Sequence, residues 1–199
     1  LTTIDARLQN FLHGVLVDAL KEHDGALAMG IVIEVNTGEV LAIDGVSQYE
    51  LEMFLPLQYG FTPGSTFKPI TATAAIDLKV VSPDQRFRTF NRSIHLGQFV
   101  KGSKRTIGEA RNSELGVDGR LSLREGLAHS INAVMVQVGL KMPIEQHRSI
   151  LIALGYGQSR QTELGVVAAG TVNPHQDWKR RDRPQAPTTI GPGIQRTPQ

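Results

Sequence analysis

The sequence predicts an α+β protein, in which a helix packs on an antiparallel sheet beside a part of the chain that is rich in helices. One observation is an apolar stripe with helical spacing near the N-terminus, directly after an acidic cap residue. Another is a pair of apolar segments on either side of an Asn-Thr-Gly turn, a pattern typical of a β-hairpin. After residue 60 the periodic segments have helical spacing, so we expect helices to dominate there.

The N-terminal part is predicted to be a helix followed by the hairpin. Residues 5–22 form the helix, with Asp5 as a suitable N-cap. Segments 30–35 and 39–43 flank residues 36–38 and are the expected strands. Seven apolar side chains share one stripe of the helix: Leu8, Phe11, Leu12, Val15, Leu16, Ala19 and Leu20.

The stretch from Pro63 to Ile76 is predicted to be a sharp loop that leads into a helix. Pro63 and Gly64 favour the loop, and the Ala-rich run that follows Pro69 contains few helix breakers. Pro69 suits the first helical turn, because a missing N–H donor costs little there. We therefore expect Ser65 to lie at or near the first turn.

Ser65 and Lys68 are three residues apart, so their side chains share one face of that helix. A serine beside a lysine is a nucleophile beside a possible base. The chemistry needs a neutral amine, which means lowering the lysine pKa from about 10.4 by roughly 3 units, or roughly 4 kcal/mol. Taken alone, the pattern is more often a serine cap beside a solvated lysine.

A second polar group, Ser130-Ile131-Asn132, interrupts an apolar region. Ser122 and Glu125 have the spacing of a capping box, which predicts a helix through Ala128. The apolar run 133–138 resumes afterwards, so Ser130 and Asn132 are expected between two helical pieces. Taken alone, the group also fits a helix-to-helix turn with capping side chains.

The remaining segments carry weaker signals. Residues 84–120 are expected to be loop with small strands, and 143–154 a helix that Gly155 stops. Residues 170–187 are expected to be a Pro-rich loop that contains a solvated basic run at 179–183.

Composition excludes several classes of function. The chain has 199 residues, of which 40% are hydrophobic and 20% charged, as in a globular domain. Its 21 basic and 19 acidic residues are too evenly balanced to predict nucleic-acid binding. Without cysteine there is neither a disulfide framework nor a thiol nucleophile. The six histidines lack the spacing of a metal site, and His129 is expected to have a surface or packing role.

Together, Ser65-Thr66-Phe67-Lys68 and Ser130-Ile131-Asn132 resemble the first two of the three active-site motifs of penicillin-binding proteins and serine β-lactamases. The neighbourhood of Ser130 and the strand at 39–42 look more like the monofunctional class B penicillin-binding proteins than the class A ones. Further segments look like parts of the transpeptidase domain: 1–9, 36–42, 59–65, 119–123 and 191–199.

The resemblance implies a peptidoglycan D,D-transpeptidase that uses no cofactor and no metal. In that reading, Ser65 attacks the carbonyl of a D-Ala-D-Ala stem peptide and Lys68 takes its proton. Ser130 relays a proton to the leaving group, and Asn132 hydrogen-bonds the substrate amide. β-Lactam antibiotics mimic this substrate. The resemblance also implies the extracytoplasmic face of the cell membrane, an anchor upstream of Leu1 and other cell-wall synthesis proteins as partners, in division or elongation.

The third motif of the family, Lys-Thr-Gly or Lys-Ser-Gly on a strand, does not occur in the expected place. Lys101-Gly102-Ser103 has the wrong order and comes too early. In the family this strand comes after the point reached at Gln199, and Thr197-Pro198 has the pattern of a helix start. We therefore expect residues 1–199 to be a partial transpeptidase domain, incomplete at the C-terminus, with an unpaired sheet edge.

Two alternatives remain open at this stage. One is a β-lactamase or β-lactam sensor, which shares the serine and the lysine. No residue in the sequence can be assigned to activating water for deacylation. The other is a non-catalytic scaffold of the cell wall or the division machinery, which keeps the fold without turnover.

Overall fold

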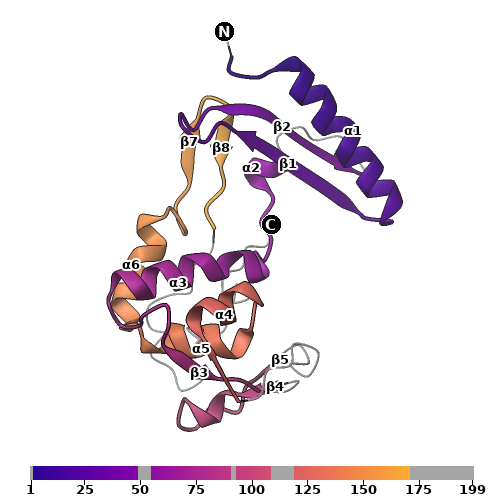
Figure 1. The fold of residues 1–199 in the computed structure, drawn as a ribbon. Coiled ribbons are helices and arrows are strands. Elements are labelled where there is room, and N and C mark those ends of the chain that lie inside the picture. The colour runs from indigo at the N-terminus through magenta and orange to yellow at the C-terminus, as the bar shows by residue number, and fades with distance from the viewer. Residues whose placement is uncertain (1, 49–54, 91–92, 109–118, 171–199) are drawn as a thin grey trace. The chain divides into compact units, whose positions relative to one another are not determined.

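A computed structural model describes residues 2–48, 55–90, 93–108 and 119–170 (Figure 1). The chain forms two compact units. The first contains the described residues of Leu1–Gly60 together with Ser159–Ala168, and the second those of Phe61–Gln158 together with residues 169–170. In the described part, no helix combines the length and apolar character that crossing a membrane requires.

The first unit begins with helix α1 (Ala6–Glu22), which packs against the hairpin of β1 (Leu27–Ile33) and β2 (Val40–Ser47). Asp5 caps α1, because its Oδ1 accepts hydrogen bonds from the backbone N–H groups of Arg7 (2.8 Å) and Leu8 (3.2 Å). The predicted helix, its cap and the hairpin are confirmed. Each strand is longer than predicted at the end remote from the turn.

The two strands pair antiparallel from Leu27 opposite Ser47 to Ile33 opposite Val40, with an irregularity between Val32 and Ile33. Gly38 allows the tight turn between them, because its φ of +76° is unfavourable for residues with a side chain. Its N–H donates to the carbonyl of Glu34 at 2.8 Å. The Asn-Thr-Gly signal therefore located the turn correctly.

The outer edges of this sheet differ. On β2, the Gln9 side-chain amide donates to the Ile43 carbonyl (2.8 Å) and accepts from the Ile43 N–H (2.9 Å), as a neighbouring strand would. The Asp5 N–H also donates to the Leu41 carbonyl at 2.9 Å. Within the described residues, β1 pairs with β2 alone.

The apolar stripe of α1 is wider than the face that packs on the sheet. Leu16 is buried, whereas Phe11 and Val15 are 71% and 46% exposed. A helical period shows which side chains share a stripe, but the width of the contact depends on the surface that the helix meets.

Three elements of the first unit were not predicted. They are α2 (Leu55–Gln58) and the hairpin of β7 (Arg160–Thr162) and β8 (Gly165–Val167). The Ala168 N–H donates to the Leu57 carbonyl at 2.8 Å and links the end of the hairpin to α2. Elements of three or four residues are too short to show a hydrophobic period.

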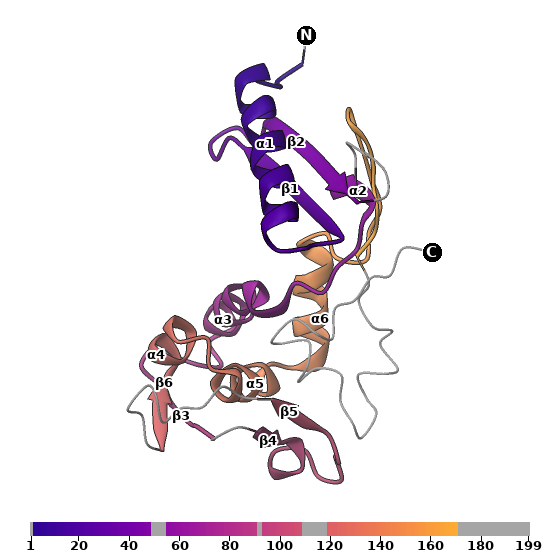
Figure 2. The same ribbon diagram turned by 90° about the vertical axis from the view of Figure 1, so that its right-hand side faces the viewer.

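The second unit is built around helix α5 (Asn132–Lys141), against which α3 (Lys68–Asp77) and α4 (Leu123–Ala128) pack (Figure 2). Helix α6 (Ile144–Ala153) follows, with Leu154 as its C-cap, and Gly155 directly after the cap has a φ of +92°. Most of α5 is apolar on all sides and buried, as expected of a central helix. Its fully buried side chains are Ala133, Val134, Met135, Val136 and Val138.

Two small ribbons complete the second unit, as predicted for residues 84–120. Strand β3 (Arg86–Arg88) pairs antiparallel with β6 (Arg120–Ser122), and β4 (Ser93–His95) with β5 (Thr106–Gly108). The 3₁₀ helix η2 (Leu96–Gln98) begins the connection between β4 and β5.

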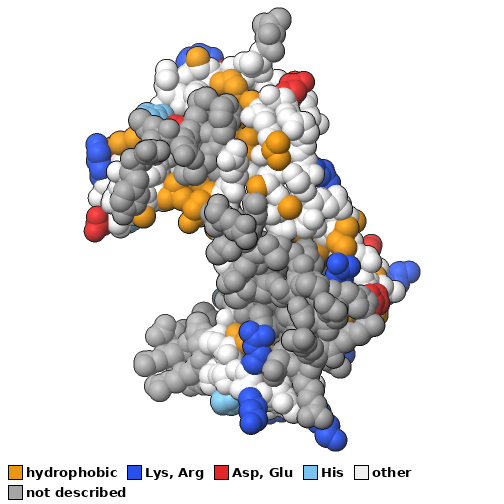
Figure 3. Space-filling view, turned by 180° about the vertical axis from the view of Figure 1, so that it is seen from behind, with side chains coloured by type: hydrophobic (Ala, Val, Ile, Leu, Met, Phe, Trp, Pro, Cys, Tyr) orange, Lys and Arg blue, Asp and Glu red, His pale blue; other side chains and the backbone are white. Residues whose placement is uncertain are grey.

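Several sequence predictions lie outside the described residues. They are the Pro-rich loop from residue 171 onward, the basic run at 179–183 and the helix start at Thr197-Pro198. On the face drawn in Figure 3, the Lys and Arg side chains of the described surface are scattered rather than gathered in one patch.

Candidate active site

The Ser65 segment begins with a turn that only glycine adopts easily. Gly64 has a φ of +58°, and it opens the 3₁₀ helix η1 (Gly64–Phe67), which continues directly into α3. Side chains three residues apart eclipse each other in a 3₁₀ helix, so Ser65 and Lys68 lie on one face, as predicted. Ser65 is exposed and Lys68 is buried. The segment therefore presents the Ser65 hydroxyl to solvent and has the buried Lys68 on the same helical face.

Lys68 is only 1% exposed, which is unusual for a lysine. Its Nζ donates to the backbone carbonyl of Ser130 at 2.5 Å and lies 2.9 Å from the Ser130 Oγ. Burial of an amine is tolerable only when its hydrogen-bonding capacity is used. The structure therefore brings together the two motifs that the sequence singled out, across 62 residues of chain.

Ser130 has a φ of +55°, a left-handed conformation that is rare for residues other than glycine. It follows the C-cap of α4, His129, which is exposed, in agreement with its predicted surface role. The N–H of Ser130 donates to Leu127 O (3.0 Å), and that of Ile131 donates to Gly126 O (2.8 Å). These two bonds define a Schellman motif, in which glycine normally takes the position of Ser130. The motif turns the Ser130 carbonyl and hydroxyl toward Lys68.

Asn132 is the first residue of α5, so the prediction that it precedes the second helix was wrong by one residue. Its Nδ2 donates to the Gly108 carbonyl on β5 at 2.8 Å. This bond identifies the Asn132 atom that faces Gly108 as the nitrogen Nδ2, so the other terminal atom of the amide is the oxygen Oδ1. The β4–β5 ribbon, which sequence reasoning did not connect to the site, therefore holds one of the predicted site residues.

A small apolar cluster supports the Ser65 turn from the side of α6. Phe67 and Leu151 are buried, and the Phe67 ring meets the Tyr156 ring edge-on, with centroids 5.6 Å apart.

His147, also on α6, is 1% exposed, and this burial lowers its pKa from 6.5 to about 4. Burial likewise raises the pKa of Tyr156.

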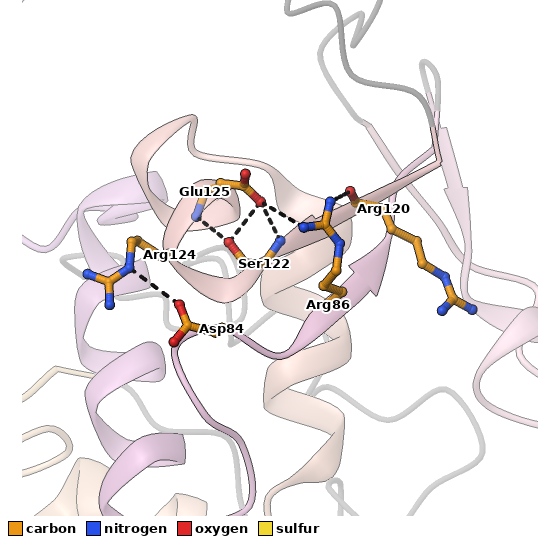
Figure 4. Close-up of polar contacts among 6 residues, drawn as sticks. All are labelled: Asp84, Arg86, Arg120, Ser122, Arg124 and Glu125. Atoms are coloured by element: carbon orange, nitrogen blue, oxygen red, sulfur yellow. Dashed lines mark hydrogen bonds and ion pairs between the residues drawn. The ribbon is translucent and has the colours of Figure 1, made fainter.

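The capping box that starts α4 is present as predicted, and Figure 4 shows its side chains. The Glu125 Oε2 accepts hydrogen bonds from the Ser122 N–H and Oγ, both at 2.8 Å, while the Glu125 N–H donates to the Ser122 Oγ at 3.2 Å. These donors lower the pKa of Glu125 below its usual 4.5. The Arg86 Nη1 lies 3.9 Å from the same Oε2.

The arrangement suits transfer of an acyl group to a serine. An exposed hydroxyl stands on the first turn of a helix, where backbone N–H groups lack intrahelical partners and favour negative charge. On the same helical face, the buried Lys68 amine contacts the Ser130 hydroxyl, so a proton can pass between those two groups. No set of three or more His, Asp or Glu side chains among the described residues is arranged to hold a metal ion.

Comparisons with known proteins agree on one family. The family model of the penicillin binding protein transpeptidase domain matches residues 28–199. Peptidoglycan D,D-transpeptidase FtsI of Escherichia coli strain K12 is 28% identical over 208 residues, which cover 98% of this chain. The transpeptidase domain of Burkholderia pseudomallei penicillin-binding protein 3 has a TM-score of 0.80 and 26% identity over 98% of this chain. A peptidoglycan glycosyltransferase from Burkholderia ambifaria has a TM-score of 0.81, also at 26% identity and 98% coverage.

The chain spans only part of each relative. It covers 32% of the length of the Escherichia coli protein. It covers 54% of the Burkholderia pseudomallei chain and 57% of the Burkholderia ambifaria chain.

Proposed function

We propose that this chain, which belongs to the family of penicillin-binding protein transpeptidase domains, carries the acylated serine of a peptidoglycan D,D-transpeptidase. The observation that carries the proposal is the contact of the buried Lys68 Nζ with the Ser130 Oγ, 2.9 Å away. It joins the two motifs into one site, and Ser65 is exposed on the same helical face as Lys68. The substrate is the D-Ala-D-Ala end of a stem peptide.

In the acylation step, the Ser65 Oγ attacks the carbonyl carbon of the penultimate D-Ala, and its proton passes to the neutral Lys68 amine. The Ser65 N–H, in the first helical turn, is one donor to the oxyanion that forms. The bond from that carbonyl carbon to the nitrogen of the terminal D-Ala then breaks. The leaving amine takes a proton through the Ser130 hydroxyl, which Lys68 resupplies, and an ester on Ser65 remains.

In the second step, an amine of another stem peptide attacks the ester carbonyl. A peptide bond forms, the Ser65 oxygen leaves, and the proton released by the amine returns to it through Lys68. Asn132 hydrogen-bonds the amide of the bound substrate and so holds the carbonyl near Ser65. A β-lactam takes the place of the D-Ala-D-Ala end, and its opened ring stays attached to the ester.

By the same reasoning we expect the protein to act on the extracytoplasmic side of the membrane, where peptidoglycan is cross-linked. Its partners would be other cell-wall synthesis proteins.

Penicillin tests this proposal in the full-length protein. The intact mass should rise by that of one penicillin, and peptide mapping should place the adduct on Ser65. A long-lived adduct is expected of a transpeptidase or a sensor, and rapid release would instead indicate a β-lactamase. Failure to form any adduct would favour the non-catalytic scaffold, and an adduct on another serine would refute the assignment of Ser65.

A further inference from the structure

Helix α4 ends where Ser130 begins its left-handed turn, so the orientation of α4 sets the position of the Ser130 hydroxyl. The helix contains only six residues, Leu123–Ala128. Isolated helices of fewer than about 12 residues are marginal in water, because nucleation is unfavourable and few hydrogen bonds follow it. The ends of α4 and its packing must therefore hold it in place.

At the N-terminus, each N–H group from Ser122 to Glu125 has a partner outside the helical ladder. Two partners belong to the turn that precedes β3, and two belong to the capping box, which Figure 4 shows. The bonds are Ser122 N to Glu125 Oε2 (2.8 Å), Leu123 N to Gln85 O (3.0 Å), Arg124 N to Pro83 O (3.0 Å) and Glu125 N to Ser122 Oγ (3.2 Å). In these four bonds, Glu125 is the residue of α4 whose side chain accepts a hydrogen bond at this end of the helix.

At the C-terminal end, the orientation of α4 determines the position of Ser130. The Schellman bonds run back from Ser130 and Ile131 to Leu127 and Gly126, and Ile131 is buried. Gly126 also packs closely on α5, since a Cβ atom there would lie 2.5 Å from the Val134 Cγ1. Any rotation of α4 about its N-terminal attachment therefore moves the Ser130 hydroxyl relative to Lys68.

We propose that Glu125 is a positioning residue for Ser130, which acts by closing the capping box of α4; this inference rests on the proposed function for the role of Ser130. The competing explanation is that Glu125 is only a surface partner of Arg86. That ion pair is long, at 3.9 Å, and both side chains are about half-exposed. Exposed pairs of this kind contribute little, whereas the Glu125 Oε2 accepts two capping bonds of 2.8 Å from Ser122.

Three variants of the full-length protein separate these explanations. Glu125→Ala removes the capping carboxylate, while Glu125→Gln keeps an acceptor that a capping box tolerates. Arg124→Ala is the matched control, because it removes a neighbouring exposed side chain and a 3.7 Å ion pair with Asp84 but leaves every capping bond in place. The readouts are the second-order rate of acylation by a fluorescent penicillin and the hydrogen exchange of the Ser130 and Ile131 amides.

For Glu125→Ala we expect exchange at both amides to accelerate about five- to thirty-fold, the usual effect of a lost cap. Acylation should slow by a factor between about 5 and about 10², the latter being the effect of a misplacement near 1 Å. Glu125→Gln should recover most of both losses, and Arg124→Ala should match the wild type.

Wild-type acylation and exchange in Glu125→Ala would overturn the inference. So would a loss in Arg124→Ala of the same size, because it would show that any change on this helix surface has the effect. A wild-type protein that is never acylated would instead refute the proposed function, and the exchange measurement would still decide whether Glu125 holds the Ser130 turn.

Discussion

Lowering the pH from 7.5 to 5 should destabilise this protein by about 2 kcal/mol through one buried side chain, His147. The imidazole lies on α6 and is 1% exposed, and burial lowers its pKa from 6.5 to about 4. In the unfolded chain the ring takes a proton below pH 6.5, whereas in the folded protein it stays neutral until about pH 4. Stability therefore rises with pH between about 4 and 6.5 and is lost as the pH falls through that window.

The size of the effect follows from these two pKa values. At pH 5 the unfolded state is stabilised by protonation by about 2 kcal/mol relative to the folded state, and at pH 4 by about 3 kcal/mol. At pH 7.5 the difference is close to zero, because the ring is neutral in both states. The measurement is best kept at or above pH 5, where aspartate and glutamate remain ionised and contribute little to the slope.

Urea unfolding at pH 5.0 and 7.5 provides the assay, with His147→Leu as the test variant and His95→Gln as the control. His95 is exposed on β4, so its replacement removes a histidine without removing a buried one. The wild type and His95→Gln should lose about 2 kcal/mol at pH 5, and His147→Leu should lose almost none. A His147→Leu protein with the wild-type pH dependence would refute the reasoning.

Substitutions at three other positions test the Ser130 backbone, the packing of α4 on α5, and a contact between His13 of α1 and Asp44 of β2 in the first unit. Ser130→Gly should be more stable to urea than Ser130→Ala by about 1 kcal/mol, because glycine adopts the left-handed conformation without strain. Both variants should lose acylation. Equal stabilities of the two variants would contradict the backbone strain assigned to Ser130. Gly126→Ala should destabilise the protein by about 1–3 kcal/mol in urea unfolding, because the added Cβ would lie 2.5 Å from the Val134 Cγ1 and 2.6 Å from the Val134 Cβ; a wild-type midpoint would contradict this close packing of α4 on α5. His13→Ala should cost about 1–3 kcal/mol in urea unfolding, because the buried Asp44 carboxylate loses its 2.7 Å bond to the His13 Nδ1; an unchanged midpoint would show that water replaces the ring.

The parts that the sequence predicted well are those decided by local chemistry. The cap at Asp5, the Gly38 turn, the capping box of Ser122 and Glu125 and the stop at Gly155 each depend on residues within four positions of one another. The structure contains all of them. The face shared by Ser65 and Lys68 is local in the same way.

The parts that the sequence could not predict depend on distant contacts. Nothing in the neighbourhood of Ser130 indicates a left-handed backbone, because the usual sign of that conformation is glycine. The bond from Asn132 to Gly108 joins residues that are 24 positions apart. The exposure of Phe11 depends on which surface α1 meets, and helical spacing does not contain that information.

The proton-acceptor role of Lys68 is tested most directly by the acylation rates of Lys68→Arg and Lys68→Met in the full-length protein. Arginine stays charged at any working pH and methionine has no basic atom, so neither can take the proton of Ser65. The account predicts that penicillin acylates both variants at least about 10²-fold more slowly than the wild type, while their circular dichroism spectra stay unchanged. Near wild-type acylation in either variant would show that Lys68 is a structural amine, which holds the Ser130 turn and takes no part in the chemistry.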